Sequence, residues 1–237
     1  MDVVSIVNMK GGAGKTTTAA NLAAVLGKEQ KRVLLVDLDS QASLTCSLGI
    51  QEEHNVFTGV RWVETKMPNV FLVPGGPDLV RHEMDLAAQE SFQVLRRLLS
   101  GVQGFDFLVL DCPPNLYGST VNAIVASDQL LMPVPPSLKS IRSVGTTMRL
   151  LRNLGTKGNP VPSRICAFLT IYRKLAIETQ LIQLLENVVP QVLNTRIRQS
   201  AHYSKEELYC TAAALFSTAK SSPVVDHQSL VRELGLL

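Results

Sequence analysis

Short, almost uninterrupted apolar runs alternate along this chain with longer stretches whose apolar residues recur every three or four positions. The short runs are typical of strands buried on both faces of a parallel sheet, and the longer stretches of the helices that cover it. We therefore expect an α/β fold with a doubly wound, mostly parallel sheet and helices on both faces. The expected strands are 3–7, 33–36, 70–73, 105–110, 129–134 and 165–171, and the expected helices are 15–27, 92–100, 119–126, 138–154, 175–188 and 226–236.

The stretch 138–154 shows the helical pattern clearly, because its apolar residues form one face and its basic residues lie mostly on the other. The stretch 49–69 has few periodic apolar residues and predicts an irregular surface excursion. No internal repeat or low-complexity linker interrupts the chain, so residues 1–237 are expected to form a single domain. The apolar set of 138–154 is Ile141, Val144, Met148 and Leu151, and the basic set is Lys139, Arg142, Arg149 and Arg152.

Between the first expected strand and the first expected helix lies the sequence Lys-Gly-Gly-Ala-Gly-Lys-Thr-Thr, residues 10–17. Strand, glycine-rich loop and helix are the context that a phosphate-binding loop requires. Gly11, Gly12 and Gly14 allow backbone N–H groups to turn toward a polyphosphate. The positive end of the following helix also favours anions. The segment therefore predicts a nucleotide site.

Two lysines frame this loop. Lys15 is placed to reach the β- and γ-phosphates, and the Thr16 hydroxyl to ligate Mg²⁺. The common pattern G-x-x-x-x-G-K-[ST] would have its first glycine at Met9, and a second lysine, Lys10, stands directly before the glycines. A glycine-rich turn with two surface lysines is the alternative, but the flanking strand and helix favour a phosphate loop.

Two further strands end in acidic residues. The second expected strand runs into Asp37 and Asp39, and the fourth runs into Asp111. Ligands of open parallel sheets bind beyond the carboxyl ends of the strands, so these acids should gather beside the phosphate loop. There Asp111 would hold Mg²⁺, and a second carboxylate would orient the attacking water. Taken alone, Asp37 and Asp39 also fit solvated acids at a strand end.

The loop at 10–17 resembles the deviant Walker A motif of the ParA/MinD family of P-loop ATPases, in its Soj-like partition branch. The run 37–41 resembles that family's D-x-D-P-Q switch, with Ser40 where proline is usual, and Asp-Cys-Pro-Pro at 111–114 occurs in many ParA-like proteins. The resemblance extends over most of the chain and implies a P-loop NTPase that binds and hydrolyses ATP with Mg²⁺. It also implies a homodimer in which Lys10 crosses to the nucleotide of the partner subunit.

The same resemblance assigns individual roles. It makes Lys10, Lys15 and Asp39 catalytic, with Asp39 positioning the attacking water. Asp37 would support the Mg²⁺ shell or the switch conformation, and Asn8 and Asn21 would support the loop geometry. The expected metal ligands are Thr16, Asp37 and Asp111, and the expected nucleotide contacts are Lys10, Gly11, Gly12, Ala13, Gly14, Lys15, Thr16, Thr17 and Arg198.

The stretch 194–207 resembles the late segment of ParA-type proteins, where an arginine-bearing strand end lies near the adenine. In the family, basic residues of the C-terminal half bind nonspecific DNA across the ATP dimer, which here suggests Arg196, Arg198 and Lys220. For Arg196 and Arg198, a contact with the base or with water alone stays an alternative to a DNA phosphate. A ParB-like or other small cargo-adaptor protein would stimulate hydrolysis, and a plasmid, a chromosome or a protein body would be the cargo.

Charge and composition agree with this picture in part. Residues 1–129 carry 10 Lys and Arg against 14 Asp and Glu, and residues 130–237 carry 13 against 6, so the C-terminal half is basic. A basic half favours binding to polyanions, although a solvated basic surface without a partner explains the charge equally well.

No apolar run reaches the about 18 residues of a membrane helix, and the chain starts directly with a strand rather than a signal peptide. Four scattered cysteines suggest reduced thiols. We expect a cytoplasmic, nucleoid-associated protein without a membrane partner.

Three other uses of the loop stay open. A MinD-like membrane ATPase needs a basic amphipathic tail, but 224–237 carries only Arg232, offset by Glu233, and is expected to dock against the domain. Electron transfer of the nitrogenase-reductase kind needs cysteines at a dimer interface, where Cys112 is a single candidate. Lys10 argues against a metabolic P-loop kinase or synthetase.

Overall fold

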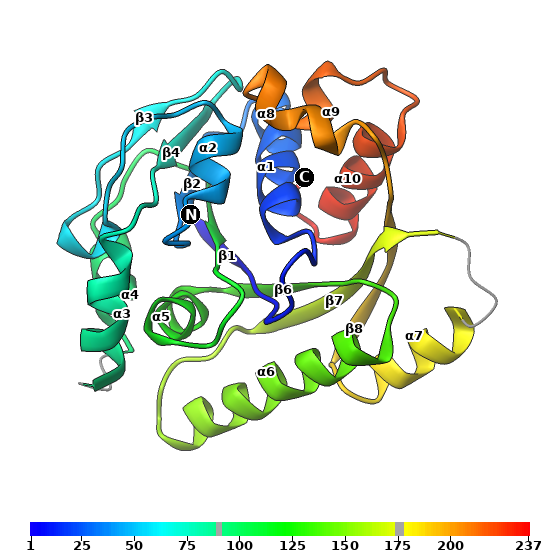
Figure 1. Ribbon diagram of the computed structural model, residues 1–237. Helices are drawn as coiled ribbons and strands as arrows, with labels where there is room; N and C mark the ends of the chain where they lie inside the picture. Colours follow the sequence, from blue (N-terminus) through cyan, green and yellow to red (C-terminus); the bar gives the residue numbers. More distant parts are fainter. Residues whose placement is uncertain (89–91, 174–177) are drawn as a thin grey trace.

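An eight-stranded sheet runs through the computed structural model, which describes residues 1–88, 92–173 and 178–237 (Figure 1). Its strands stand in the order β3-β4-β2-β5-β1-β6-β7-β8, and all neighbours are parallel except β3 and β4. The mostly parallel, doubly wound sheet is therefore confirmed. The strands are β1 (Asp2–Ile6), β2 (Val33–Asp37), β3 (Val63–Glu64), β4 (Val70–Val73), β5 (Phe107–Asp111), β6 (Gln129–Val134), β7 (Arg164–Tyr172) and β8 (Gln191–Arg198).

Helices cover both faces of this sheet, with α1 and α10 on one side and α5, α6 and α7 on the other (Figure 1). Successive side chains of a strand point to opposite faces, so each strand serves both layers. In β2, Leu34 and Val36 enter the layer under α4 to α7, whereas Val33 and Leu35 enter the layer under α1 and α10. The helices are α1 (Lys15–Lys28), α2 (Ser43–Ser47), α3 (Leu79–Ala88), α4 (Val94–Ser100), α5 (Gly118–Ala126), α6 (Leu138–Thr156), α7 (Glu178–Glu186), α8 (Glu206–Tyr209), α9 (Ala213–Phe216) and α10 (Ser222–Glu233), with 3-10 turns η1 (Val56–Thr58) and η2 (Tyr203–Lys205).

The strand order brings three loops to one edge of the sheet. β1 lies between β5 and β6, and β2 lies on the far side of β5. In the register, Ile6 is opposite Asp111, and Asp111 is opposite Asp37. The phosphate loop after β1 and both acidic strand ends therefore meet at the carboxyl edge, as expected.

Several elements differ from the sequence expectation. The segment 49–69 is more than an excursion, because Val56 and Met67 are buried and β3 adds an antiparallel edge strand. The expected final helix, 226–236, begins earlier at Ser222, because Pro223 suits a first helical turn. The helix α3 was not expected, and the first residues of the expected helix 175–188 lie outside the described residues.

Candidate nucleotide-binding site

The phosphate loop connects β1 to α1, as the sequence predicted. Gly12 and Gly14 have φ angles of 69° and 88°, which residues with a Cβ rarely adopt. Gly14 is also the N-cap of α1, and its carbonyl accepts from the Thr18 amide at 2.9 Å. The first amides of α1 and those of the loop are therefore available to an anion.

Side chains from distant strands hold this loop in place. Asn8 donates from Nδ2 to the Pro133 carbonyl at 2.7 Å, and its Oδ1 accepts from the Lys10 amide at 2.9 Å. From β7, Thr170 donates its hydroxyl to the Ala13 carbonyl at 2.8 Å. Asn8 thus supports the loop, as expected.

Asn21 has a different role from the one expected. It lies in the second turn of α1 and donates from Nδ2 to Glu206 at 2.6 Å, while its Oδ1 accepts from the Ala214 amide at 2.8 Å. It therefore ties α1 to the segment that contains α8 and α9, and its hydrogen bond to the phosphate loop in the described part of the chain goes to the Thr17 carbonyl.

A cavity of about 370 Å³ opens beside the loop. Its volume lies within the range of small-molecule sites. The loop and the start of α1 form one wall, and the ends of β7 and β8 form the other. The lining residues are Gly12, Ala13, Gly14, Lys15, Thr16, Thr17, Thr18, Thr170, Ile171, Ile197, Arg198, Gln199, Ser200 and Tyr203.

Lys15 places a buried cation at this cavity, since only 7% of its surface is exposed. Burial lowers the pKa of Lys15 from its ordinary value, and the Asp111 carboxylate opposes the shift. A polyphosphate would replace the solvent that the ammonium has lost, so the residue is prepared for an anion.

Asp111 is a fully buried carboxylate at the end of β5. Neither of its oxygens has a hydrogen-bond partner within the described residues. Burial raises the pKa of Asp111 to about 8, the neighbouring Asp37 adds to this rise, and Thr16 and Lys15 oppose it. An unpartnered buried carboxylate beside a threonine hydroxyl is short of positive charge and fits Mg²⁺.

Among the described residues, no group of three or more His, Cys, Asp or Glu side chains could hold a metal ion. Mg²⁺ at P-loops does not need one, because phosphate oxygens and water complete its shell. Asp111 and Thr16 are therefore the residues that would hold Mg²⁺ here together with phosphate oxygens.

Asp37 organises the segment that follows β2 and includes the start of α2, which we call the switch loop (residues 38–45). Its Oδ2 accepts from the Thr45 amide at 2.9 Å and the Thr45 hydroxyl at 2.7 Å, and its Oδ1 accepts from the Asp39 amide at 3.0 Å. Burial raises the pKa of Asp37 to about 6 despite these bonds. Of the two roles expected for Asp37, the hydrogen bonds support the switch role, and metal ligation stays a prediction.

Asp39 lies half-buried in the switch loop. Its Oδ1 accepts from the Gln41 amide at 3.0 Å, and its carbonyl accepts from the Ala42 amide at 2.9 Å. The side chain is close enough to Lys15 to act on that ammonium electrostatically. Both acids of the expected switch are therefore at the site although Ser40 replaces the usual proline.

Lys10 points to a second hollow. Its ammonium donates to the hydroxyls of Ser140 and Ser137 on α6, at 3.1 and 3.3 Å. It lines a groove of about 510 Å³ together with Met9, Gly11, Lys139, Arg142, Ser143 and Thr146. Neither Lys10 nor Gly11 is among the described residues that line the first cavity. The structure therefore places Lys15 in the first cavity and Lys10 in the neighbouring groove.

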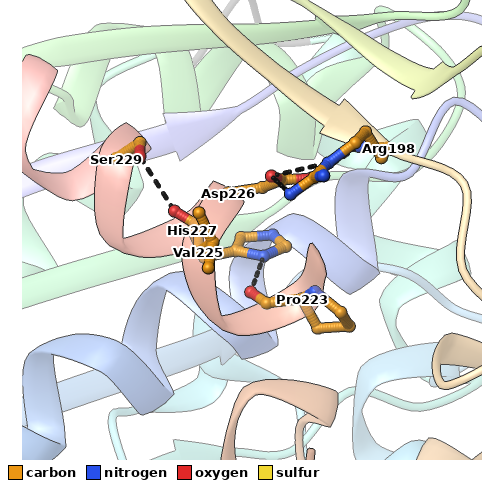
Figure 2. A network of polar contacts seen from close by, with 6 residues as sticks. All are labelled: Arg198, Pro223, Val225, Asp226, His227 and Ser229. Atoms are coloured by element: carbon orange, nitrogen blue, oxygen red, sulfur yellow. Dashed lines mark hydrogen bonds and ion pairs between the residues drawn. The ribbon is translucent and has the colours of Figure 1, made fainter. Parts of the chain in front are cut away.

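The three arginine and lysine candidates for DNA lie in different surroundings. Arg198 lines the cavity, and its guanidinium pairs with Asp226 of α10 at 2.6 Å (Figure 2). The Arg196 guanidinium donates to the Leu193 and Asn194 carbonyls of its own strand. Lys220 is exposed before α10.

Sequence reasoning missed several residues of the site. Asp226, which fixes Arg198, carries no local signal because its partner lies 28 residues away. Thr170 could have been noticed, because it stands near the carboxyl end of an expected strand. Ser137, Ser140 and Ser143 recur every three residues after a proline pair, a spacing that places them on one face of a helix.

Comparisons with known proteins agree with this geometry. The family described as AAA domain matches residues 1–161. The chromosome-partitioning ATPase Soj of Thermus thermophilus is 34% identical over 174 residues, which span 71% of this chain and 69% of Soj. The ATP complex of McdA from Cyanothece shares the fold, with a TM-score of 0.86 at 23% identity over 99% of this chain and 96% of McdA.

A further solved structure is cobyrinic acid a,c-diamide synthase from Mycobacterium smegmatis with a bound ATP analog and magnesium. Its TM-score is 0.83 at 26% identity, over 99% of this chain and 94% of the synthase. The phosphate loop, the unpartnered carboxylate beside Thr16, the family match and the Soj relationship agree with one another. The chain belongs to the ParA/MinD family of P-loop ATPases, in its Soj-like branch, and it is an ATP hydrolase that works with Mg²⁺.

Proposed function

We propose that this protein is an ATP-switched partition or positioning ATPase. Two copies close on ATP, and the closed dimer binds DNA without sequence preference. Hydrolysis, stimulated by a ParB-like or other small cargo-adaptor protein, then releases the DNA. The cargo is a plasmid, a chromosome or a protein body, and the protein works in the cytoplasm on the nucleoid.

The position of Lys10 carries this proposal. Lys15 lines the nucleotide cavity of its own chain, whereas Lys10, five residues earlier, lines the neighbouring groove. A lysine that lies outside the nucleotide cavity of its own chain is not placed to contact the phosphates bound there. It is useful where a second copy presents a nucleotide to it, and this supports the sandwich dimer.

Each residue of the site has a defined task in this scheme. The loop amides and Lys15 bind the β- and γ-phosphates, and Lys10 of the partner copy adds positive charge where it develops in the transition state. Thr16 and Asp111 would hold Mg²⁺, which neutralises phosphate charge when bound. Asp39 orients the attacking water.

The switch loop offers a route from nucleotide to dimer. Thr45 bonds Asp37, and its hydroxyl accepts from the Gly75 amide at 2.9 Å. Asp37, Thr45 and the segment after β4 therefore form one connected unit beside Asp39. We infer that contacts to the γ-phosphate favour the closed dimer through this unit, and that their loss returns the open chain.

Charge supports DNA as the partner of the closed dimer. The helix α6 carries four basic residues and no acidic one, and Lys139, Arg142, Arg149 and Arg152 are all exposed. Such a surface binds phosphates with a strong dependence on salt. Lys220 can add to it, whereas Arg196 and Arg198 are engaged within the chain.

The membrane alternative has less support. Val224, Leu230 and Val231 of α10 are buried in the domain, which confirms that the C-terminal segment docks. Among the described residues, no helix has the length and apolarity to cross a bilayer. A synthase reaction like that of the structural neighbour also uses ATP, so the test below must separate these functions.

Mass in solution and DNA binding test the proposal together. With ATP and Mg²⁺ the protein should form dimers that bind random duplex DNA, and the affinity should fall steeply between about 50 and 200 mM salt. Lys15→Ala should abolish nucleotide binding, whereas Lys10→Ala should bind ATP but not dimerise. Binding to anionic lipid vesicles instead of DNA would favour the MinD-like alternative. A protein that stays monomeric with ATP and ignores DNA would contradict the proposal.

A further inference from the structure

A row of serines on α6 faces the phosphate loop. Ser137, Ser140 and Ser143 recur every three residues, so their side chains lie on one side of the first turns. Ser140 and Ser137 accept hydrogen bonds from the Lys10 ammonium at 3.1 and 3.3 Å. Ser143 donates its hydroxyl to Asn8 Oδ1 at 2.8 Å. All three hydroxyls therefore act on the same short piece of the loop.

Ser143 fixes the backbone of Lys10 through Asn8, whereas Ser137 and Ser140 bind its side chain. Asn8, which Ser143 holds, accepts from the Lys10 amide at 2.9 Å and donates to Pro133 at 2.7 Å. The backbone of Lys10 is thus anchored. The side chain, which ends at Ser137 and Ser140, can move its ammonium by rotation about its four-carbon stem while the backbone stays anchored.

The contact that holds the ammonium is electrostatically weak. Ser137 and Ser140 are neutral, and Lys139 and Arg142 line the same groove. No carboxylate is among the described residues that line it. Ser137 is also the N-cap of α6, where the helix dipole is positive. The two hydroxyls offer the ammonium hydrogen bonds but no negative charge to offset Lys139 and Arg142, so a phosphate, which adds its own negative charge, is the better partner.

We propose that Ser137 and Ser140 are positioning residues, which hold the Lys10 ammonium in the single chain and release it when two copies close on ATP. This inference rests on the proposed function, because it requires that Lys10 reaches the partner's nucleotide. The dimer requires one released Lys10 side chain from each of its two chains. The association constant of the dimer is therefore proportional to the square of the fraction of chains in which Lys10 is released from the serines. The serine pair thereby raises the ATP dimer's dissociation constant and restrains early closure.

Ser140→Ala tests this directly. Ser140 is fully buried inside a helix, where alanine is well tolerated, and it is the nearer of the two acceptors. The dissociation constant of the ATP-dependent dimer should fall about fourfold to hundredfold, because the about twofold to tenfold effect of one lost hydrogen bond per chain enters squared. ATP affinity at concentrations too low for dimers should be unchanged, which a loss of structure would not allow.

Three further variants sharpen the test. Ser137→Ala combined with Ser140→Ala should tighten the dimer more, and Ser137→Thr, which keeps the hydroxyl, should retain the wild-type constant. Thr156→Ala, at the far end of the same helix, removes a hydroxyl that bonds only a carbonyl, and it should change nothing. If the double variant does not fold, the single variant Ser140→Ala still decides.

The outcomes separate this inference from the proposed function. A wild-type chain that does not dimerise with ATP, or a Lys10→Ala variant that dimerises equally well, overturns both. Lys10-dependent dimers whose constant is unchanged or weaker in folded Ser140→Ala overturn the serine inference alone.

Discussion

At the scale of single residues, buried charge defines the site. Lys15 and Asp111 are buried together, and burial opposes the charged form of each. Their charges partly balance one another, but Asp111 keeps two unpartnered oxygens in the described part of the chain. The site therefore has a place for a cation on the acid and a place for an anion on the lysine, which is what a magnesium nucleotide supplies.

Asp39→Ala should slow ATP hydrolysis about a hundredfold and leave ATP binding intact, because the carboxylate orients the attacking water and does not hold the phosphates. Long-lived ATP dimers should accumulate, which single-turnover hydrolysis together with mass measurement would detect. Asp106→Ala, on an exposed acid at the opposite edge of the sheet, is the control. A normal hydrolysis rate in Asp39→Ala would refute the assignment.

Thr170→Val should weaken ATP binding about threefold to tenfold. The variant keeps the shape of the side chain but loses the 2.8 Å hydrogen bond to the Ala13 carbonyl, so the loop is held less firmly. Calorimetric titration with ATP and Mg²⁺ measures the change. An unchanged affinity would show that the Thr170 bond does not contribute to ATP binding.

At the scale of elements, the segment after β4 packs tightly against the switch loop. A Cβ on Gly75 would lie 2.8 Å from Asp37 Cγ and 2.8 Å from the Asp39 carbonyl oxygen. Real Cβ atoms do not approach that closely, so glycine is required here by contact and not by its backbone angles. The breaker sequence that ends β4 is thus part of the functional site.

Gly75→Ala should lower the free energy of unfolding by about 1–3 kcal/mol and impair hydrolysis, since the switch loop must shift to admit the methyl group. Urea unfolding and ATPase assays measure the two effects. Gly101→Ala is the matched control, because its nearest neighbour would be 3.7 Å away. Equal stability of the two variants would argue against the contact.

The helix α6 joins two functions along its length. Its first turns hold Lys10, and its outer face carries exposed cations without an acid in the helix.

Arg149→Ala with Arg152→Ala should weaken DNA binding similarly for all sequences and reduce the slope of log affinity against log salt by about 1 to 2. Lys28→Ala, on the opposite layer, serves as control. A slope equal to wild type would place the DNA elsewhere.

At the scale of the whole molecule, Glu206 couples the two ends of the chain. Its Oε1 accepts from Asn21 in α1 and from the Ala213 amide, and Tyr203 lies nearby. Burial raises the pKa of Glu206 to about 7. Between its unfolded pKa and that value the folded chain binds more protons, so the burial cost grows as pH rises.

Glu206→Gln should therefore stabilise the protein relative to wild type by about 1–3 kcal/mol more at about pH 8 than at about pH 5. The amide oxygen can still accept both hydrogen bonds. Urea unfolding at the two pH values measures the difference, with the exposed Glu207→Gln as control. A difference that does not depend on pH would contradict the titration of Glu206.

Local sequence patterns were sufficient to predict most of the strands and the longer helices of this molecule. Apolar runs predicted every long strand up to β7, because buried parallel strands need apolar side chains on both faces. Short helices such as α2, α8 and α9 escaped, because four or five residues do not complete two turns of a pattern. The segment 49–69 is mostly exposed or half-buried and irregular, as expected, but its 3-10 turn and two-residue edge strand were too short to show a period.

The sequence by itself determined the phosphate loop, the acidic strand ends and the strands that carry them, since each depends on neighbouring residues. The order in which these strands pair was decided by the tertiary structure. Only the tertiary structure decided what these groups contact. Lys10 meets serines about 130 residues away, Asn21 meets a glutamate 185 residues away, and Arg198 meets an aspartate on the last helix. Such pairs arise when the sheet and its helices pack, and packing between distant segments leaves no local pattern in the chain.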